Sequence, residues 1–483
     1  MSVQLYNHLS ETVEPFESIE PGKIRLYTCG PTVYNYLTVG NWAAYIYWDT
    51  LVRTLSANEY DVTRVMNITD VGHLVSDADD GEDKLEKGAR REGKTAWDVA
   101  KFYTDDFVAG MKALNLLPPS HLPKATEYIE QQLELVRTLK AKDFTYQIDD
   151  GIYFDTQKFP KYDEFAHLQL DAQKAGARVE FNPEKHHSSD FALWKFTPAG
   201  ETRDMEWATP ADLITEGIER QGFPGWHLEC SAMAMSLLGE TLDIHTGGID
   251  HIPVHHTNEI AQSEAATGKQ FSRFWLHNNH LKVNGTKISK SLGNGYTLSD
   301  LAEKGFSPLD LKLVILQGHY RNEGNFTFEG LESAHNRRLH WRNVAALRHQ
   351  IHDTLVDTDS ATDNPVGYAA SQALLETLSR DLDTPAALSL IDETFSEIEK
   401  LGTERINRHA LVSFLETIDS LLGLELLATT PDISDEVKKL IIQRRHARDN
   451  KNYALSDTLR ADIEANEIAV RDTPNGSIWE YAA

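Results

Sequence analysis

The chain of 483 residues carries 47 lysines and arginines against 74 aspartates and glutamates, a formal net charge of −27. This length predicts several domains, and this charge excludes a protein that binds nucleic acid through a globally basic surface, although a local basic surface for RNA is compatible with it. Two cysteines exclude a disulfide framework and indicate a reducing compartment.

The N-terminal sequence, MSVQLYNHLSETVEPFE, has neither the basic and apolar regions of a secretory signal nor an arginine-rich amphipathic pattern. No apolar run reaches the length of a membrane span. We therefore expect a cytoplasmic protein with no membrane partner.

Strand and helix patterns alternate in the first part of the chain. Residues 23–30 (KIRLYTCG) alternate apolar and polar side chains before a Gly-Pro turn, which predicts a strand. From Trp42 onward, WAAYIYWDTLVRTL has apolar residues at helical spacing, and EYDVTRVMNITDVG predicts a second, buried strand. Strand, helix and strand in this order predict a parallel sheet with right-handed crossovers.

The middle of the chain predicts an insertion, because residues 126–224 are rich in turns and aromatic side chains. The alternation resumes at TLDIHTGGID, and a basic loop, NGTKISKSLGNG, follows. Beyond about residue 300, helical periodicity predominates. LATTPDISD is typical of a linker, and the final stretch from KKLIIQ to EANEI is helical and locally basic.

Four residues are of the types that zinc accepts as ligands. His255 and Glu259 are four positions apart, which places both side chains on one face of a helix. Together with Cys29 and Cys230 they offer two thiolates, an imidazole and a carboxylate. Spacing alone does not bring the four together, so a role for each cysteine as a small buried hydrophobic residue stays open at this point.

Two segments have features of a phosphate site. LTVGNW opens a helix, so that backbone N–H groups and the side chains of Thr38 and Asn41 could face an anion; simple helix capping is the alternative. The TKISKS loop places Lys287 and Lys290 three positions apart, where two ammonium groups could stabilise charge on a polyphosphate; a solvated basic turn is the alternative.

Two further segments are weaker signals. In HTGGID, Gly247 and Gly248 would let the backbone approach a ligand closely, and Asp250 could accept a ribose hydroxyl or an ammonium group; a plain turn is the alternative. The acidic run from Asp77 to Asp83 is not an EF-hand calcium loop, because Gly81 is its fifth residue rather than its sixth.

Taken together and in this order, the segments resemble the cysteinyl-tRNA synthetases, which are class I aminoacyl-tRNA synthetases. The motifs that carry the resemblance are CGPTVYNYLTVGN, NITDV, DFALWK, GWHLECSAM, DIHTGGID, HHTNEIAQSEA and KISKSLGN, with a last block, RRHARDNKNYALSDTLRADIEANEIAVRDTPNGSIW. The resemblance extends from about Tyr27 to Asn294 and returns near the end of the chain.

The resemblance implies an α/β, Rossmann-like catalytic domain with a parallel sheet and a connective insertion, followed by an α-helical bundle and a small C-terminal anticodon-binding domain. The expected divisions are catalytic halves at 1–125 and 225–300, an insertion at 126–224, a stem-contact region at 301–350, the bundle at 351–430 and the anticodon-binding domain at 431–483.

The activity implied by the resemblance is ATP-dependent activation of L-cysteine to cysteinyl-adenylate and transfer to the 3′ end of tRNA(Cys), by a monomer. One Zn²⁺ per subunit would be held by Cys29, Cys230, His255 and Glu259 and would select the substrate thiol, and ATP with Mg²⁺ would be a substrate. Serine is nearly isosteric with cysteine, and a selectivity of ~10⁴ needs about 5.5 kcal/mol of differential binding, which a metal–sulfur bond can supply.

By the same resemblance, TVGN stands at the family's HIGH-type motif and KISKS at its KMSKS loop. Threonine at the first position keeps a donor at the helix start, and Gly72 and His73 replace an acidic pair after NITDV. The implied catalytic residues are Thr38, Asn41, Lys287 and Lys290. The implied ATP-binding residues are those four with Gly40, Gly247 and Gly248. The implied substrate-binding residues are Cys29, Thr69, Trp226 and Asp250.

Two alternatives stay open. A cysteine ligase that joins cysteine to an amino sugar would share the catalytic domain but lack the C-terminal block. A catalytically impaired paralogue that binds RNA or senses cysteine is suggested only by Thr38. In favour of tRNA, we expect a local basic strip on the C-terminal helices formed by Lys438, Lys439, Arg444, Arg445, Arg448 and Lys451.

Overall fold

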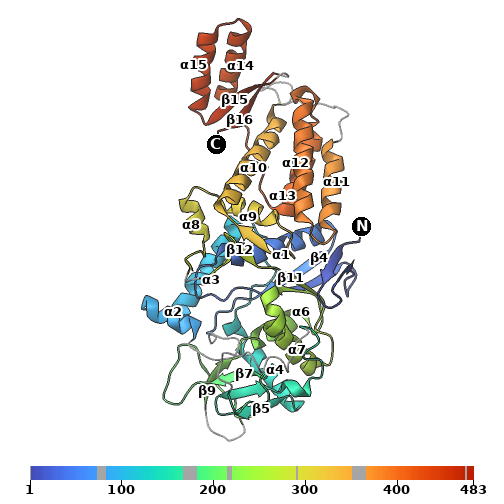
Figure 1. The fold of residues 1–483 in the computed structure, drawn as a ribbon, viewed down its shortest axis with the longest axis vertical. Helices are drawn as coiled ribbons and strands as arrows, with labels where there is room; N and C mark the ends of the chain where they lie inside the picture. Colours follow the sequence, from blue (N-terminus) through green and yellow to red (C-terminus); the bar gives the residue numbers. More distant parts are fainter. Residues whose placement is uncertain are drawn as a thin grey trace.

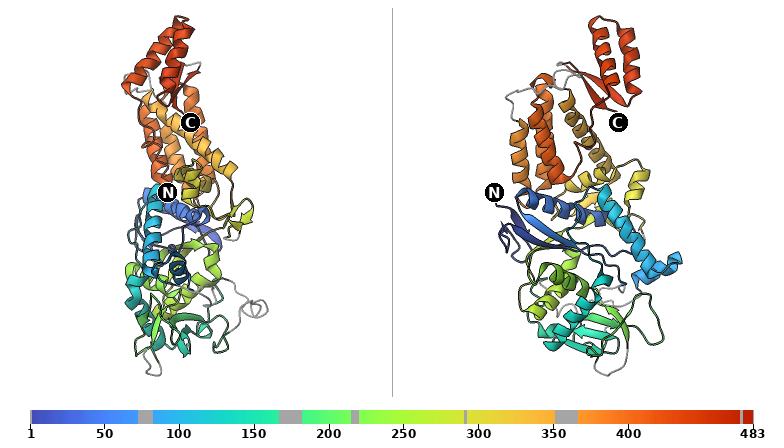
Figure 2. Two further views of the ribbon diagram at one scale, coloured as in Figure 1. Left: turned by 90° about the vertical axis from the view of Figure 1, so that its left-hand side faces the viewer. Right: turned by 180° about the vertical axis from the view of Figure 1, so that it is seen from behind.

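The computed structural model describes residues 2–72, 83–166, 182–214, 220–289, 292–350, 366–473 and 476–482. These residues form an elongated molecule, with an α/β part in the middle, the insertion at one end and the C-terminal helices at the other (Figures 1 and 2). None of the helices in these ranges combines the length and the apolar character needed to cross a membrane.

A parallel sheet lies in the α/β part. Its described strands are in the order β11-β10-β3-β4, and every neighbouring pair is parallel. Their bounds are β3 Lys23–Thr28, β4 Asp61–Met66, β10 Leu242–Gly248 and β11 Ser272–Asn278. Both strands predicted near the N-terminus are confirmed, as is their parallel pairing.

Helix α1 (Val39–Ala57) connects β3 to β4 and is buried along most of its length, including Trp42 and Trp48. The chain goes from β3 to β4 in one direction across the sheet and from β10 to β11 in the other, so the strand order reverses between β3 and β10. Ligands in open α/β sheets bind beyond the carboxyl ends of the strands at such a reversal.

The predicted insertion is confirmed between β4 and β10. It contains α4 (Ile129–Ala141) and an antiparallel sheet whose described strands are in the order β5-β6-β7-β9-β8. The aromatic residues of this segment fill its core, which includes Phe154, Phe191 and Trp194. The strand bounds are β5 Thr145–Ile148, β6 Gly151–Phe154, β7 Phe191–Phe196, β8 Trp207–Ala208 and β9 Gln221–Pro224.

The predicted helical region beyond residue 300 is also confirmed. Its helices are α8 Leu298–Glu303, α9 Pro308–Leu316, α10 Phe328–Ala346, α11 Val366–Leu378, α12 Thr384–Leu401 and α13 Arg408–Leu422. The last part of the chain packs two helices on an antiparallel hairpin around the buried Trp479. These elements are α14 Asp435–Asp449, α15 Tyr453–Glu464, β15 Ile468–Thr473 and β16 Gly476–Tyr481.

The remaining elements surround the sheet. An N-terminal hairpin pairs β1 with β2, and a small sheet contains β12, β13 and β14. The bounds are β1 Gln4–Asn7, β2 Thr12–Pro15, α2 Lys84–Glu92, α3 Ala96–Ala113, α6 Leu228–Leu238, α7 Thr257–Thr267, β12 Leu281–Val283, β13 Thr286–Lys287 and β14 Gly324–Phe326.

A buried group of charges joins α1 to the helical region. The Asp49 carboxylate accepts hydrogen bonds from Arg53 Nε at 2.7 Å and from Lys312 Nζ at 3.1 Å. Arg53 also donates to the carbonyl oxygens of Asp419 and Ser420, in the last turn of α13. Because these charges are almost fully buried and mutually paired, they fix the C-terminal half of α1 against the helical bundle.

Candidate active site and metal centre

A cavity of about 600 Å³ opens at the carboxyl ends of β3 and β10, where the strand order reverses. The predicted site residues that line it are Cys29, Thr38, Gly40, Asn41, Trp226, Gly247, Gly248, Asp250 and Lys287. Residues with no predicted role line it as well, among them Tyr36, His251, Asn278, Asn279, His280 and Lys282. The predicted ATP and substrate segments therefore meet at one cavity.

The TVGN turn begins α1 beside this cavity. The backbone N–H and the hydroxyl of Thr38 both donate to Oδ1 of Asn41, at 3.0 and 2.8 Å. The two residues thus cap the helix, as the alternative interpretation required, and they also line the cavity. Since the first turn, residues 39–42, carries no acidic side chain, the positive end of the helix dipole is available to an anion.

The basic loop and Tyr296, the residue after it, hold the TVGN turn in place. The N–H of Val39 donates to the carbonyl of Tyr296 at 2.8 Å, and a side chain on Gly40 would place Cβ 2.7 Å from Cδ1 of Ile288. The exposed Lys287 lies at the cavity wall. Lys290 lies outside the described residues, so its position in the loop stays a prediction.

The four residues predicted as metal ligands come from separate parts of the fold and converge. Cys29 follows β3, Cys230 lies in the first turns of α6, His255 lies in the π-helical turn Ile252–His256, and Glu259 lies in the first turn of α7. Their ligand atoms all lie within 4.8 Å of one another. Nε2 of His255 is 3.0 Å from Oε1 of Glu259, as the spacing of four residues predicted.

The donor chemistry of this group fits a divalent metal ion. Burial raises the pKa of the Cys29 thiol, and it raises the pKa of Cys230 well above its ordinary value. A metal ion between the donors reverses this effect, because a coordinated thiol loses its proton. Burial also raises the pKa of Glu259, but His245 and His255 lower it by more, to about 2, so that this group is a carboxylate at neutral pH.

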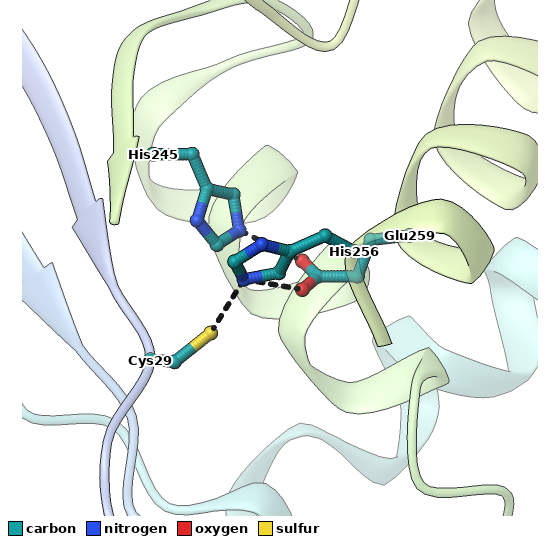
Figure 3. A group of neighbouring side chains, drawn as sticks. All are labelled: Cys29, His245, His256 and Glu259. Carbon is teal, nitrogen blue, oxygen red and sulfur yellow. Dashed lines mark hydrogen bonds and ion pairs between the residues drawn. The ribbon is translucent and has the colours of Figure 1, made fainter. Parts of the chain in front are cut away.

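Two histidines that the sequence analysis missed complete the cluster. His245 Nε2 lies 3.0 Å from Oε2 of Glu259, and His256 Nε2 lies 3.4 Å from Cys29 Sγ. Figure 3 shows these four side chains turned toward one another. A signal was available, because His256 precedes Glu259 by three residues and therefore shares its side of the helical segment.

The NITD segment shapes the loop that holds Cys29. Asn67 Oδ1 accepts the backbone N–H of Gly30 at 2.8 Å, and a side chain on Gly30 would overlap the carbonyl of Asn67. Glycine after Cys29 therefore lets the two loops touch. Thr69, predicted to bind substrate, is buried away from the cavity wall and donates to Glu229 at 2.5 Å, so its role stays a prediction.

Comparisons with known proteins agree with this geometry. Residues 15–336 match the family described as "tRNA synthetases class I (C) catalytic domain", and residues 430–479 match the "Cysteinyl-tRNA ligase anticodon binding domain". The cysteine–tRNA ligase of Treponema denticola is 39% identical over 99% of this chain and 100% of its own length. Cysteine–tRNA ligase 1 of Burkholderia lata is 40% identical over 99% of this chain and 96% of its own length.

The chain belongs to the cysteine–tRNA ligase family. Two solved structures share its fold. A methionyl-tRNA synthetase of Mycobacterium tuberculosis bound by methionyl-adenylate has a TM-score of 0.57 and 15% identity, over 90% of this chain and 96% of that one. A LeuRS–tRNA–LeuAMS complex of Agrobacterium radiobacter has a TM-score of 0.60 and 13% identity, over 87% and 86%. The predicted class I synthetase fold is confirmed.

Part of the basic strip predicted on the C-terminal helices was wrong. Lys438 is 9% exposed and paired with Asp432 at 2.5 Å. Arg444 is 2% exposed and donates two hydrogen bonds to Asp472, at 3.0 and 2.9 Å. Both residues face partners within the fold, which a helical pattern does not reveal. The exposed members of the strip are Lys439, Arg445, Arg448 and Lys451.

Proposed function

We propose that this chain activates L-cysteine with ATP and transfers the cysteinyl group to tRNA(Cys), with one Zn²⁺ per subunit selecting the thiol. The observation that carries the proposal is the position of the four donors. Cys29, the half-buried member, lines the same cavity as the TVGN turn and Lys287. Metal selection of a substrate group and ATP chemistry thus share one cavity.

In the first step, a carboxylate oxygen of cysteine attacks the α-phosphorus of ATP, an O–P bond forms, and the bond to the pyrophosphate leaving group breaks. The N-terminus of α1, with Thr38 and Asn41, would hold the phosphates by hydrogen bonds. Lys287 and Lys290 would stabilise the negative charge that develops during the displacement. Because Gly247 and Gly248 have no side chains, they would let the nucleotide approach the backbone at the end of β10 closely.

Cys29, Cys230, His255 and Glu259 would hold the zinc ion, which when bound supplies a thiolate-selective ligand position. Asp250 would accept the ammonium group of cysteine, and Trp226, whose ring centroid lies 5.6 Å from that of His255, would form a wall of the amino-acid pocket. Serine fits the same space but binds zinc weakly through a hydroxyl, so no separate hydrolytic step is needed.

In the second step, a hydroxyl of the terminal ribose of tRNA attacks the carbonyl carbon of the adenylate, the new ester bond forms, and AMP leaves. The match of residues 430–479 to an anticodon-binding domain supports tRNA as the acceptor and argues against the amino-sugar ligase. The divisions at residues 125, 224, 300, 350 and 430 are part of this proposal. The cytoplasmic location and the monomeric state stay predictions.

The test is ATP–pyrophosphate exchange followed by charging. We expect exchange with cysteine, none above background with serine, and esterification of a tRNA(Cys) transcript. This result would also exclude an impaired paralogue and show that Thr38 supports adenylation. Exchange without charging of any tRNA(Cys) tried would contradict the second step, and absence of exchange in zinc-loaded protein would contradict the first.

A further inference from the structure

A second set of four donors overlaps the first. Cys29, His245, His256 and Glu259 also place one ligand atom each within 4.8 Å of one another. This set shares Cys29 and Glu259 with the first set but replaces Cys230 and His255 with two other histidines (Figure 3). The second set lies deeper, since neither His245 nor His256 is among the residues that line the cavity.

The two oxygens of Glu259 contact different histidines. Oε1 lies 3.0 Å from Nε2 of His255, which belongs to the first set, and 4.0 Å from Nε2 of His256, which belongs to the second. Oε2 lies 3.0 Å from Nε2 of His245, which belongs to the second set alone. A carboxylate in this position can give one oxygen to each of two ions. Thiolate sulfur has lone pairs for two metals as well, so Cys29 can be shared in the same way.

The histidines of the second set are held in a position to bind metal. Nδ1 of His256 lies 2.8 Å from Nε2 of His277, which leaves Nε2 of His256 directed at Cys29. Metal-binding histidines usually have their second nitrogen fixed by a hydrogen bond of this kind. The ring of His245 stacks on Trp275, with centroids 4.5 Å apart and planes at 16°, and this contact fixes its orientation toward Glu259.

The local charge is suited to two divalent ions. Two thiolates and one carboxylate among the donors carry three negative charges, and the carboxylates of Glu229 and Asp250 act electrostatically on Cys29. We propose that Cys29, His245, His256 and Glu259 form a second metal position, which binds Zn²⁺ once zinc exceeds one ion per chain, with Cys29 and Glu259 bridging the two ions. The second ion binds more weakly, because its two unshared ligands are neutral histidines, whereas the unshared ligands of the first ion include the Cys230 thiolate.

The proposal is tested by counting metal ions, which requires no substrate and so does not depend on the proposed activity. The full chain is depleted of metal and titrated with Zn²⁺ against a chromophoric chelator. We expect two equivalents in the unaltered protein, one tight and one weaker. One equivalent at every zinc concentration would overturn the proposal. Anomalous scattering from zinc-soaked crystals gives an independent count, with two peaks about 3.5–4 Å apart expected.

Variants separate the two positions. Cys230→Ser should lose the tight equivalent and keep the weaker one, whereas His256→Gln and His245→Gln should keep the tight equivalent and lower the affinity of the weaker one by more than ~10-fold. His251→Gln is the matched control, because His251 belongs to the same cluster of rings but to neither donor set, and it should keep both equivalents. A weaker equivalent that persists unchanged in His256→Gln and His245→Gln would place the second ion elsewhere and overturn the proposal.

Discussion

Arg444 and Arg445 are neighbours in sequence but should have separable roles. Arg444 is almost fully buried and donates two hydrogen bonds to Asp472, which also pairs with Arg448 at 2.6 Å. Replacing Arg444 with glutamine removes two charge-assisted hydrogen bonds. Because Arg448 still pairs with Asp472, we expect the free energy of opening this part of the fold to fall by only about 2 kcal/mol. This corresponds to about 30-fold more opening of α14 and the β15–β16 hairpin.

Hydrogen exchange of peptides from residues 431–482 measures this opening. Arg445→Gln is the control, because Arg445 is exposed on the same helix. We expect it to leave exchange unchanged while raising KM for tRNA and reducing the salt dependence of binding by about one phosphate contact. The account would be contradicted if neither variant exchanged faster than the unaltered protein and Arg444→Gln raised KM for tRNA. That result would show that Arg444 contacts RNA and does not stabilise the fold.

The same ion pair predicts a pH dependence. Arg444 lowers the pKa of Asp472 well below its usual value despite partial burial, with Ser477 and Arg448 adding to the effect. A depressed carboxyl pKa stabilises the fold above the unfolded pKa of about 3.9, and this contribution is lost as the pH falls through the folded value. The difference in exchange between the unaltered protein and Arg444→Gln should therefore shrink below about pH 4.

Three other substitutions have defined expectations. Burial raises the pKa of Asp70 to about 6 from 3.8. The stability that the protonated carboxyl contributes is therefore lost as the pH rises through 6. Asp70→Asn should be more stable than the unaltered protein above pH 6, by up to about 3 kcal/mol, and equally stable below pH 4, which thermal denaturation against pH would test. Gly40→Ala places Cβ against Ile288 and should slow pyrophosphate exchange by up to ~100-fold, whereas an unchanged rate would show that the turn does not position ATP. Arg53→Met removes one of the two cations paired with the buried Asp49 and should lower the free energy of unfolding by about 3–5 kcal/mol, measured by urea denaturation; a decrease below 1 kcal/mol would contradict the pairing.

Local patterns were sufficient to predict the α/β part of the fold. Alternating residues before the Gly-Pro turn at Gly30 and helical spacing from Trp42 describe short-range backbone preferences, and both predictions are confirmed. The spacing of His255 and Glu259 was informative for the same reason. The convergence of Cys29 and Cys230 depends on contacts between β3 and α6, so it was expected only through the resemblance to a family.

Apart from His256, which lies three residues before Glu259, the missed features depend on partners distant in sequence. His245 lies on a buried strand where a histidine gives no signal of its own, and its role follows from the position of Glu259 on another element. The burial of Arg444 depends on Asp472, which lies 28 residues later in a hairpin. A helical pattern places Arg444 and Arg445 on different faces but does not say which face is covered.

The most direct test of the account is cysteine-dependent ATP–pyrophosphate exchange in protein depleted of metal and then reloaded with one equivalent of Zn²⁺. We expect exchange with cysteine to disappear on depletion and to return with zinc, and exchange with serine to stay at background in both states. Cysteine-dependent exchange that persists at full rate in protein shown to contain no metal would contradict the assignment of Cys29, Cys230, His255 and Glu259 to a thiol-selecting metal site.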